Sequence, residues 1–335
     1  MLKELLPRLC AGESLTADEA AAAIGEIMDG QATPAQIAAF LTALRIKGET
    51  VEEIAGGARA MRARMVRVDA GDGVILDTCG TGGDARGTFN ISTITAIVVA
   101  ACGVRVAKHG NRAASSACGS ADVLEALGVR IDPPRERLEK MLREIGIAYL
   151  HAPQFHPAMR HAAPVRKELG FRTIFNLLGP LCNPAGANVQ IVGLFSPALC
   201  RPFAEVLRAL GARAAVTFHG HDGLDELSTT GDNRAVEWRD GRIAEFSIGP
   251  EAIGVPRARL SDLAGGSPAD NARIAREVLG GTRGPHRDVV LLNAAVALVA
   301  AGRAADPREG AQRAARAIDE GAARRTLEAL AEASR

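Results

Sequence analysis

The chain has 335 residues, of which 47% are hydrophobic and 24% are charged, and its formal net charge at pH 7 is +1. This composition is typical of a globular protein with one or two domains, and the charge gives no support to a general nucleic-acid-binding or membrane-surface role. No apolar run reaches the ~18 residues that span a bilayer, the N-terminus lacks a signal-peptide pattern, and the scattered cysteines form no CxxC pair. We therefore expect a cytoplasmic protein with reduced thiols and no membrane or nucleic-acid partner.

Helix-start signatures dominate the first 66 residues. Thr16, Thr33 and Thr50 are each followed three residues later by Glu or Gln, which is the capping-box pattern. These positions predict three successive helices with no strand between them. Because three short helices bury little surface alone, we expect their apolar faces to pack on another part of the chain, on a partner subunit, or on both.

The pattern changes at Gly71-Asp72-Gly73, after which short apolar runs alternate with helical stretches. Such runs predict buried parallel strands that are covered on both faces by helices. The predicted strands are 74–76, 104–107, 147–150, 189–195 and 214–218. The segment 156–184 contains helical signals and no strand, so we assign it to the helical unit, which would create a hinge beside the ligand crevice.

The last third combines one hairpin with a run of helices. Asp240-Gly241 predicts a tight turn between strands 235–238 and 242–246, at one edge of the sheet. Helices are predicted at 268–279, at 287–301 and from 307 onwards. The expected fold class is therefore α/β, with a small all-helical domain and a larger domain that holds a mainly parallel sheet flanked by helices. We expect residues 1–68 together with about 155–182 in the helical domain, and residues 69–154 together with 183–335 in the α/β domain.

Two loops at strand ends predict a phosphate site. Gly80-Thr81-Gly82-Gly83-Asp84 follows the first strand, and Lys108-His109-Gly110-Asn111-Arg112, with the small residues up to Ser120, follows the second. Glycines let the backbone approach a ligand, and exposed backbone N–H groups attract anions. Only five of the 40 basic residues are lysines, so Lys108 indicates a need for a compact charge. Both loops should open onto the carboxyl edge of the sheet, where α/β proteins bind ligands.

Two further features have a structural and a functional interpretation. Asp225-Glu226 follows a predicted strand end and is either a solvated acidic turn or a pair of oxygen ligands for Mg²⁺. Arg166 is either a solvated surface residue or a residue whose guanidinium binds a planar carboxylate through two parallel hydrogen bonds. Neither choice is settled by the residues alone.

The segments GTGGD, TFNIST, KHGNR and SSACGSADVLEALG, with the spacing His-Pro-x-x-Arg-x-x-x-x-Val-Arg, resemble the anthranilate phosphoribosyltransferase family. The resemblance implies the two-domain fold of nucleoside phosphorylases and phosphoribosyltransferases. It also implies transfer of the phosphoribosyl group of 5-phosphoribosyl 1-diphosphate to the amine of anthranilate, which is the second step of tryptophan biosynthesis from chorismate. A homodimer and Mg²⁺, two ions per monomer, are implied as well.

The resemblance also implies roles for individual residues. Anthranilate would contact Gly80, Asn111 and Arg166, and Mg²⁺ would be bound by Ser92, Asp225 and Glu226. Lys108 would act electrostatically, and no general base is assigned. The implied contacts of 5-phosphoribosyl 1-diphosphate are Gly80, Gly83, Asp84, Thr88, Asn90, Ile91, Ser92, Thr93, Lys108, His109, Gly110, Asn111, Arg112, Ala113, Ala114, Ser115, Ser116 and Ser120.

Departures from the family pattern are few, and two alternative functions remain at this stage. Ala117-Cys118 replaces a pair that usually contains lysine in the family, which removes one positive charge near the phosphates. A pyrimidine nucleoside phosphorylase would share the fold, but the GTGGD and GLDE segments and Arg166 favour the transferase. A non-catalytic nucleic-acid-binding relative should be basic, and this chain is nearly neutral.

Overall fold

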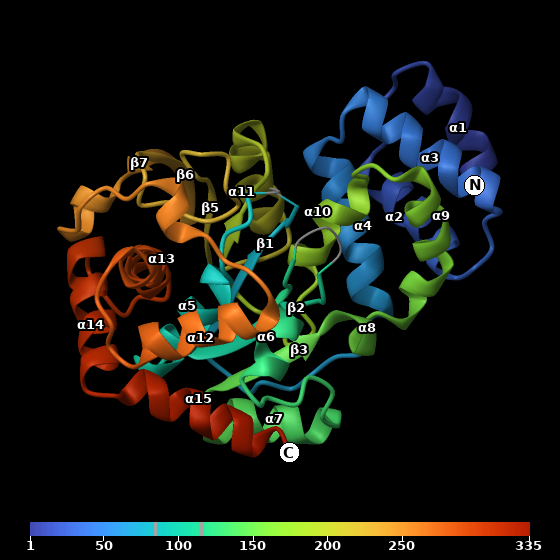
Figure 1. Ribbon diagram of the computed structural model, residues 1–335. Coiled ribbons are helices and arrows are strands. Elements are labelled where there is room, and N and C mark those ends of the chain that lie inside the picture. The colour runs from blue at the N-terminus through green and yellow to red at the C-terminus, as the bar shows by residue number, and fades with distance from the viewer. Residues whose placement is uncertain (84–85, 114–116) are drawn as a thin grey trace.

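The computed structural model describes residues 1–83, 86–113 and 117–335. It confirms the expected fold class, because a helical bundle stands beside a mainly parallel sheet that is flanked by helices (Figure 1). Among the described residues, no helix combines the length and apolar character needed to cross a membrane.

The N-terminal bundle is built from helices with strong local start signals. All three predicted capping boxes are confirmed: the side chains of Thr16, Thr33 and Thr50 accept backbone hydrogen bonds at the starts of α2, α3 and α4. A further helix, α1, was not predicted, because Met1 precedes it and supplies no side-chain cap. The bundle helices are α1 (Leu2–Cys10), α2 (Ala17–Met28), α3 (Pro34–Lys47) and α4 (Val51–Arg64).

The sheet has seven strands in the order β3-β2-β1-β4-β5-β6-β7. The five strands from β3 to β5 are parallel, and β6 and β7 are antiparallel to their neighbours. The chain moves outward from β1 in one direction and from β4 in the other, so the topological switch point lies between β1 and β4. The strands are β1 (Ile75–Gly80), β2 (Arg105–Gly110), β3 (Ile147–His151), β4 (Val189–Gly193), β5 (Ala214–His219), β6 (Asn233–Arg239) and β7 (Arg242–Ile248).

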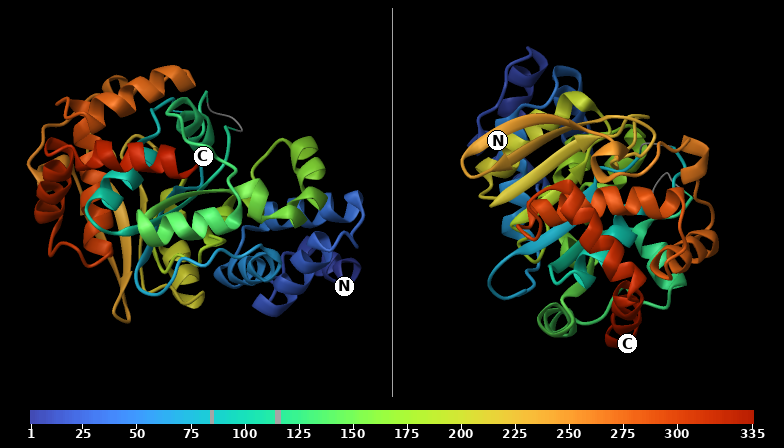
Figure 2. Two further views of the ribbon diagram at one scale, coloured as in Figure 1. Left: turned by 90° about the horizontal axis from the view of Figure 1, so that it is seen from below. Right: turned by 90° about the vertical axis from the view of Figure 1, so that its left-hand side faces the viewer.

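The predicted hairpin at the sheet edge is confirmed. Asp240 and Gly241 connect β6 to β7 with φ of 49° and 81°. Two successive positive φ values characterise the primed turn that matches the twist of a two-stranded ribbon. Figure 2 shows this ribbon along one side of the molecule.

Helices cover both faces of the sheet. On β5, the side chains of Ala214, Val216 and Phe218 belong to a core with α5 and α13, whereas Ala215 belongs to a second core that contains α11. This alternation is the period of two that a strand buried on both faces requires. The helices of the α/β part are α5 (Ile91–Ala101), α6 (Ser120–Ala126), α7 (Arg135–Glu144), α11 (Cys200–Ala209), α12 (Pro268–Leu279), α13 (Pro285–Ala300), α14 (Pro307–Asp319) and α15 (Ala322–Ala333).

The segment that interrupts the alternation after β3 is helical, as expected. It contains α8 (Ala152–Phe155), the 3₁₀ helix η1 (Pro157–His161), α9 (Ala163–Leu169) and α10 (Ile174–Leu181). α9 packs against α3, and α10 packs against α4 (Figure 1). The Arg62 Nε on α4 donates a hydrogen bond of 2.7 Å to the Leu181 carbonyl oxygen, which ties α10 to the bundle.

Two strands extend further than the sequence predicted. Gly80 lies in β1, and Lys108, His109 and Gly110 lie in β2, so these residues are strand residues and not loop residues. The reason is pairing with neighbours: Gly80 pairs with Gly193 of β4, and the end of β2 pairs with β3. The two loops that predict the phosphate site therefore begin later than expected, at Thr81 and Asn111.

Candidate functional site

Two glycines allow the acidic segment to cross the ends of β1 and β4. A Cβ atom on Gly193 would lie 1.6 Å from the Asp225 carbonyl oxygen, and one on Gly80 would lie 2.4 Å from Asp225 Oδ2. The Gly193 contact is with a backbone atom and excludes any other residue type, whereas a side chain at position 80 would force the Asp225 carboxylate to move. Sequence reasoning singled out Gly80 but missed Gly193, whose constraint comes from a residue 32 positions later.

The two adjacent carboxylates face the loop and the helix that follow β1. Asp225 Oδ2 accepts a hydrogen bond of 2.6 Å from the Gly82 N–H, and Glu226 Oε1 accepts one of 2.9 Å from the Ser92 N–H. Burial and the neighbouring charge of Asp225 raise the pKa of Glu226 to about 8. A raised pKa of this kind is the signature of two like charges held close together in a partly desolvated site.

Lys108 supplies the positive charge at this point. Its side chain is buried, and Nζ donates to the Thr78 carbonyl oxygen and lies 3.4 Å from Ser92 Oγ. Lys108 therefore connects the end of β2 to the strand and helix on either side of the first loop. Because its raised pKa keeps Glu226 largely protonated at pH 7, Lys108 balances the charge of Asp225, and a bound divalent cation would displace the Glu226 proton.

The oxygen atoms at this point are suited to bind a hard divalent cation. The side-chain oxygens of Asp225, Glu226 and Ser92 are the ligand type that Mg²⁺ prefers. Among the described ranges, no three His, Cys, Asp or Glu side chains converge on one point, so a protein-only cage is absent. A magnesium ion here would take its remaining oxygens from water and from a phosphate-bearing ligand, as is usual for Mg²⁺.

The first loop is held from the helical side by an arginine that sequence reasoning missed. Arg172, between α9 and α10, donates a hydrogen bond to the Gly83 carbonyl oxygen. Its guanidinium lies 4.2 Å from the centroid of the Phe195 ring. Gly82 and Gly83 have φ of 71° and 74°, which glycine alone adopts without strain. Asp84, expected to bind the donor, lies outside the described residues.

The start of α5 connects the two loops. Asn90, directly before α5, donates from Nδ2 to the Cys118 carbonyl oxygen at 3.1 Å and accepts at Oδ1 from Asn271 Nδ2 at 2.9 Å. Thr88 forms an isolated bridge with Ala264. Ile91 and Thr93 are buried in the first turn of the helix.

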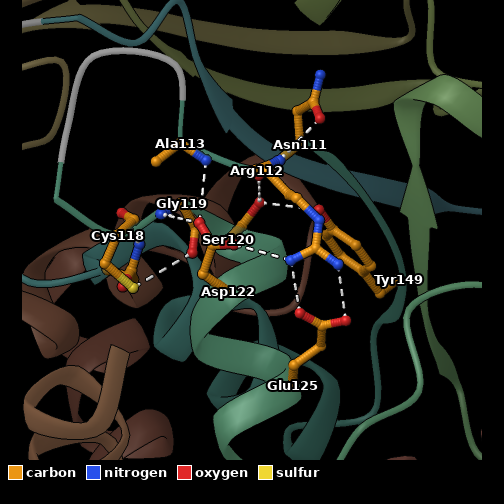
Figure 3. Close-up of polar contacts among 10 residues, drawn as sticks. Asn111, Arg112, Ala113, Cys118, Gly119, Ser120, Asp122, Glu125 and Tyr149 are labelled. Atoms are coloured by element: carbon orange, nitrogen blue, oxygen red, sulfur yellow. Dashed lines mark hydrogen bonds and ion pairs between the residues drawn. The ribbon is translucent and has the colours of Figure 1, made fainter. Parts of the chain in front are cut away.

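The second loop has its own network at its base. Arg112 forms ion pairs with Glu125 and Asp122, and the Asp122 carboxylate accepts from the Ala113 N–H at 3.0 Å. Ser120 Oγ donates to the Asn111 carbonyl oxygen at 3.1 Å. Figure 3 shows these residues grouped at the start of α6. The predicted donor contacts Ala114, Ser115 and Ser116 lie outside the described residues.

Arg166 lies on α9, apart from the carboxylates and Lys108. Its guanidinium lies 5.4 Å from the Phe175 ring centroid, and burial lowers its pKa. No carboxylate in the described part of the chain forms an ion pair with it. A half-buried arginine with this environment is suited to bind an anionic group from outside the chain.

Two histidines form a neutral pair beside the end of β2. The rings of His109 and His156 lie 5.1 Å apart between centroids, and both side chains are buried. Burial and the neighbouring imidazole lower the pKa of His109 to about 3, and burial lowers that of His156 to about 4. Neither ring is therefore a proton acceptor of ordinary strength at neutral pH.

Comparison with known proteins identifies two matching family models. The model described as "Glycosyl transferase family, helical bundle domain" matches residues 3–65, and the one described as "Glycosyl transferase family, a/b domain" matches residues 72–324. The anthranilate phosphoribosyltransferase of Moorella thermoacetica is 55% identical over 330 residues, which cover 98% of this chain and 97% of the relative.

Solved structures agree with the sequence comparison. The anthranilate phosphoribosyltransferase of Thermus thermophilus superposes with a TM-score of 0.93 at 45% identity, over 98% of both chains. The enzyme of Saccharomyces cerevisiae, solved in complex with 5-phosphoribosyl 1-diphosphate and Mg, has a TM-score of 0.91 at 31% identity. That match covers 99% of this chain and 97% of the yeast chain.

Proposed function

Because this chain belongs to the anthranilate phosphoribosyltransferase family, we propose that the ends of β1 and β4 bind the donor diphosphate with magnesium and that Arg166 binds the acceptor. The reaction of the family is transfer of the phosphoribosyl group of 5-phosphoribosyl 1-diphosphate (the donor) to the amine of anthranilate. The products are N-(5-phosphoribosyl)anthranilate and diphosphate, and the step belongs to tryptophan biosynthesis.

The donor assignment is carried by one observation, the convergence of Asp225, Glu226, Ser92 and Lys108 where β1 ends. Negative charge develops on the leaving diphosphate during the reaction, so fixed positive groups at this point lower the barrier. Lys108 and the N–H groups of the first loop would stabilise that charge. Magnesium bound by Asp225, Glu226 and Ser92 would supply further neutralisation.

The chemistry needs little proton transfer before attack, which agrees with the absence of an assigned general base. The anthranilate amine is neutral at pH 7 and attacks with its own lone pair. The ribose carbon gains oxocarbenium character as the diphosphate leaves, as a glycosidic carbon does. The task of the protein is therefore to align the amine with that carbon and to exclude water.

The acceptor assignment is supported by the environment of Arg166. Its guanidinium has no carboxylate partner among the described residues, and the adjacent Phe175 ring lies beside it. A planar carboxylate would satisfy the arginine fork, and aromatic rings pack well on apolar neighbours. Gly80 and Asn111 would complete the contact with anthranilate from the side of the sheet.

The remaining assignments rest mainly on the family likeness. We propose two Mg²⁺ ions per monomer, a cytoplasmic location and a homodimer. We further propose that residues 1–68 and about 155–182 form the helical domain, and that residues 69–154 and 183–335 form the α/β domain. This division is supported by the packing of α9 on α3 and of α10 on α4. The homodimer rests on the family likeness alone.

The donor site is tested by comparing the wild-type protein with the double variant Asp225→Asn, Glu226→Gln. Loss of anthranilate fluorescence reports turnover, and calorimetric titration with the donor and Mg²⁺ reports binding. Removing a group that stabilises developing charge costs ~10²- to 10³-fold in kcat, so the double variant should lose at least ~10³-fold. Near-normal turnover with unchanged magnesium dependence would refute the assignment.

A further inference from the structure

We propose that Asp122, together with Arg112 and Glu125, is a positioning clasp that holds the base of the second loop in the geometry that the donor requires. The clasp is defined by these three side chains, and the inference rests on the donor site proposed above. It assigns Arg112 a role through Asp122, in place of the direct phosphate contact that the family resemblance implies.

One carboxylate oxygen joins the two arms of the loop. Asp122 Oδ2 accepts a hydrogen bond of 3.0 Å from the Ala113 N–H and one of 2.9 Å from the Gly119 N–H (Figure 3). The second bond alone would be an ordinary helix cap at the start of α6. The first is different, because it reaches the opposite arm of the loop. Although burial acts in the other direction, these bonds and Arg112 lower the pKa of Asp122, so the carboxylate stays charged.

The two arms lie closer together than side chains permit. A Cβ atom on Gly119 would lie 2.3 Å from the Ala113 nitrogen, and one on Gly110 would lie 2.3 Å from Ser120 Oγ. Ser120 Oγ also lies 3.1 Å from the Tyr149 hydroxyl, which fixes the second arm to β3. The loop base is therefore a closed structure, and Asp122 is the charged group at its centre.

The guanidinium of Arg112 already forms hydrogen bonds with two carboxylates of the chain. Nη1 and Nη2 donate to the two Glu125 carboxylate oxygens at 2.6 and 2.8 Å, and Nη1 donates to Asp122 Oδ1 at 3.0 Å. Two carboxylates thus compensate one positive charge, which leaves little attraction for a phosphate. The arrangement instead orients the Asp122 carboxylate so that its other oxygen faces the two loop N–H groups.

The backbone of Arg112, whose side chain belongs to the clasp, orients Asn111. The Arg112 N–H donates to Asn111 Oδ1 at 2.8 Å, so the amide nitrogen is the end that remains for a ligand. In Figure 3 the Asn111 amide points away from the clasp. An amide N–H₂ held in this way can donate to an oxygen of the donor. Asp122 therefore contributes to donor binding without touching the donor.

Steady-state kinetics on Asp122→Asn and Glu125→Gln test this inference. An asparagine at position 122 would turn an amide N–H₂ either toward the loop N–H groups or toward Arg112, and each choice loses hydrogen bonds. We expect the KM for the donor to rise ~10-fold in Asp122→Asn and ~3-fold in Glu125→Gln, with kcat within ~3-fold of wild type. The control Glu277→Gln, which releases Arg273 from an equivalent ion pair on α12, should leave both constants unchanged.

The outcomes separate the clasp from its alternatives. If Arg112 binds a donor phosphate directly, Glu125→Gln frees the guanidinium and the donor KM falls, which overturns the inference. An unchanged donor KM in Asp122→Asn overturns it too. A merely structural role would lower the melting temperature and kcat together and leave the donor KM unaltered. If Asp122→Asn fails to fold, Glu125→Gln carries the test, because Glu125 contacts Arg112 and neither loop N–H group.

A reference variant distinguishes failure of the clasp from failure of the donor site. Lys108→Met should weaken donor binding by calorimetry whatever the role of Asp122. If Lys108→Met weakens binding and Asp122→Asn does not, the clasp is wrong and the donor site stands. If neither variant changes donor binding, the donor site itself is wrong.

Discussion

The two loops that follow β1 and β2 are held in opposite ways. The first loop depends on residues far away in the sequence. The Gly82 N–H is hydrogen-bonded to the Asp225 carboxylate, and the Gly83 carbonyl oxygen is hydrogen-bonded to Arg172. The base of the second loop depends on near neighbours, because Asp122 lies within ten residues of both arms. The first loop is therefore held by distant residues, whereas the Asp122 contacts of the second loop are local and are supplemented by Tyr149 and Asn90 from more distant parts of the chain. This difference predicts which substitutions disturb each loop.

The largest effect is expected where the first loop meets the acidic segment. In Gly193→Ala, the new methyl group would overlap the Asp225 carbonyl oxygen, so the segment carrying both carboxylates must move. We expect kcat to fall ~10³-fold, since the charge-stabilising groups are displaced together. Fluorescence assays measure kcat, and urea unfolding measures stability.

The control for this change is Gly211→Ala, at the end of α11. Unlike Gly193, which lies in strand β4, Gly211 has a positive φ of 83°, and a Cβ atom there would meet open space. The substitution should cost about 1 kcal/mol of stability through backbone strain and leave kcat unchanged. Equal losses of activity in the two variants would show that general destabilisation, and not the displaced segment, explains the result.

The next largest effect is expected for Lys108→Met, which tests the connection between the two loops. Methionine retains the buried length of the side chain but removes the charge that faces Ser92 and the carboxylates. We expect kcat/KM for the donor to fall ~10²-fold, the usual cost of losing one electrostatic contact in a transition state. A loss below threefold would contradict the electrostatic role of Lys108.

A smaller effect is expected for Arg172→Ala, which removes the contact of the first loop with the helical side. The donor KM should rise ~10-fold, because the Gly83 carbonyl loses its charged hydrogen-bond partner. Arg208→Ala is a matched control, since Arg208 lies 5.9 Å from the Trp238 ring centroid and stands away from the loop. If both arginine variants raise the donor KM equally, Arg172 has no specific part in holding the loop.

The smallest effect is expected for His156, whose ring lies beside His109 of β2, the strand that leads to the second loop. His156 has a pKa of about 4 in the folded protein, below its ordinary value of 6.5, so the unfolded chain binds more protons between these values. The free energy of unfolding should therefore fall as the pH falls from about 6.5 toward 4. Between pH 7 and pH 5 the contribution of His156 is about 1–2 kcal/mol.

Urea unfolding of wild type and His156→Gln at both pH values measures this contribution. The variant should lose less stability than wild type between pH 7 and pH 5, while His109 continues to contribute in both proteins. An identical pH dependence in the two proteins would show that His156 is not buried in its neutral form.

The parts of the molecule that sequence predicted are those with local causes. The capping boxes at Thr16, Thr33 and Thr50 and the Asp240-Gly241 turn are each specified within a few residues, and each was predicted correctly. The cap bond of Asp122 was accessible in the same way, because Asp122 stands three residues after Gly119, but its bond to the Ala113 N–H was not.

The parts that sequence missed have distant causes. Lys108 belongs to β2 because β3 pairs with it, and no pattern within its own segment indicates that extension. Gly193 and Arg172 contribute through Asp225 and Gly83, which only the folded chain brings near them. Family resemblance named the carboxylates and Arg166, but it did not reveal which residues hold them.

The second apolar core has a consequence for how the molecule moves. Buried side chains of α4, α10 and α11 form one continuous layer, so the bundle and one face of the sheet share their interior. Rotation about a flexible joint would open that layer to water, whereas sliding of packed helices over one another preserves it. The shared core therefore favours a shear of small amplitude over a hinge rotation for any movement of the bundle against the sheet, and a detached bundle would expose an apolar surface.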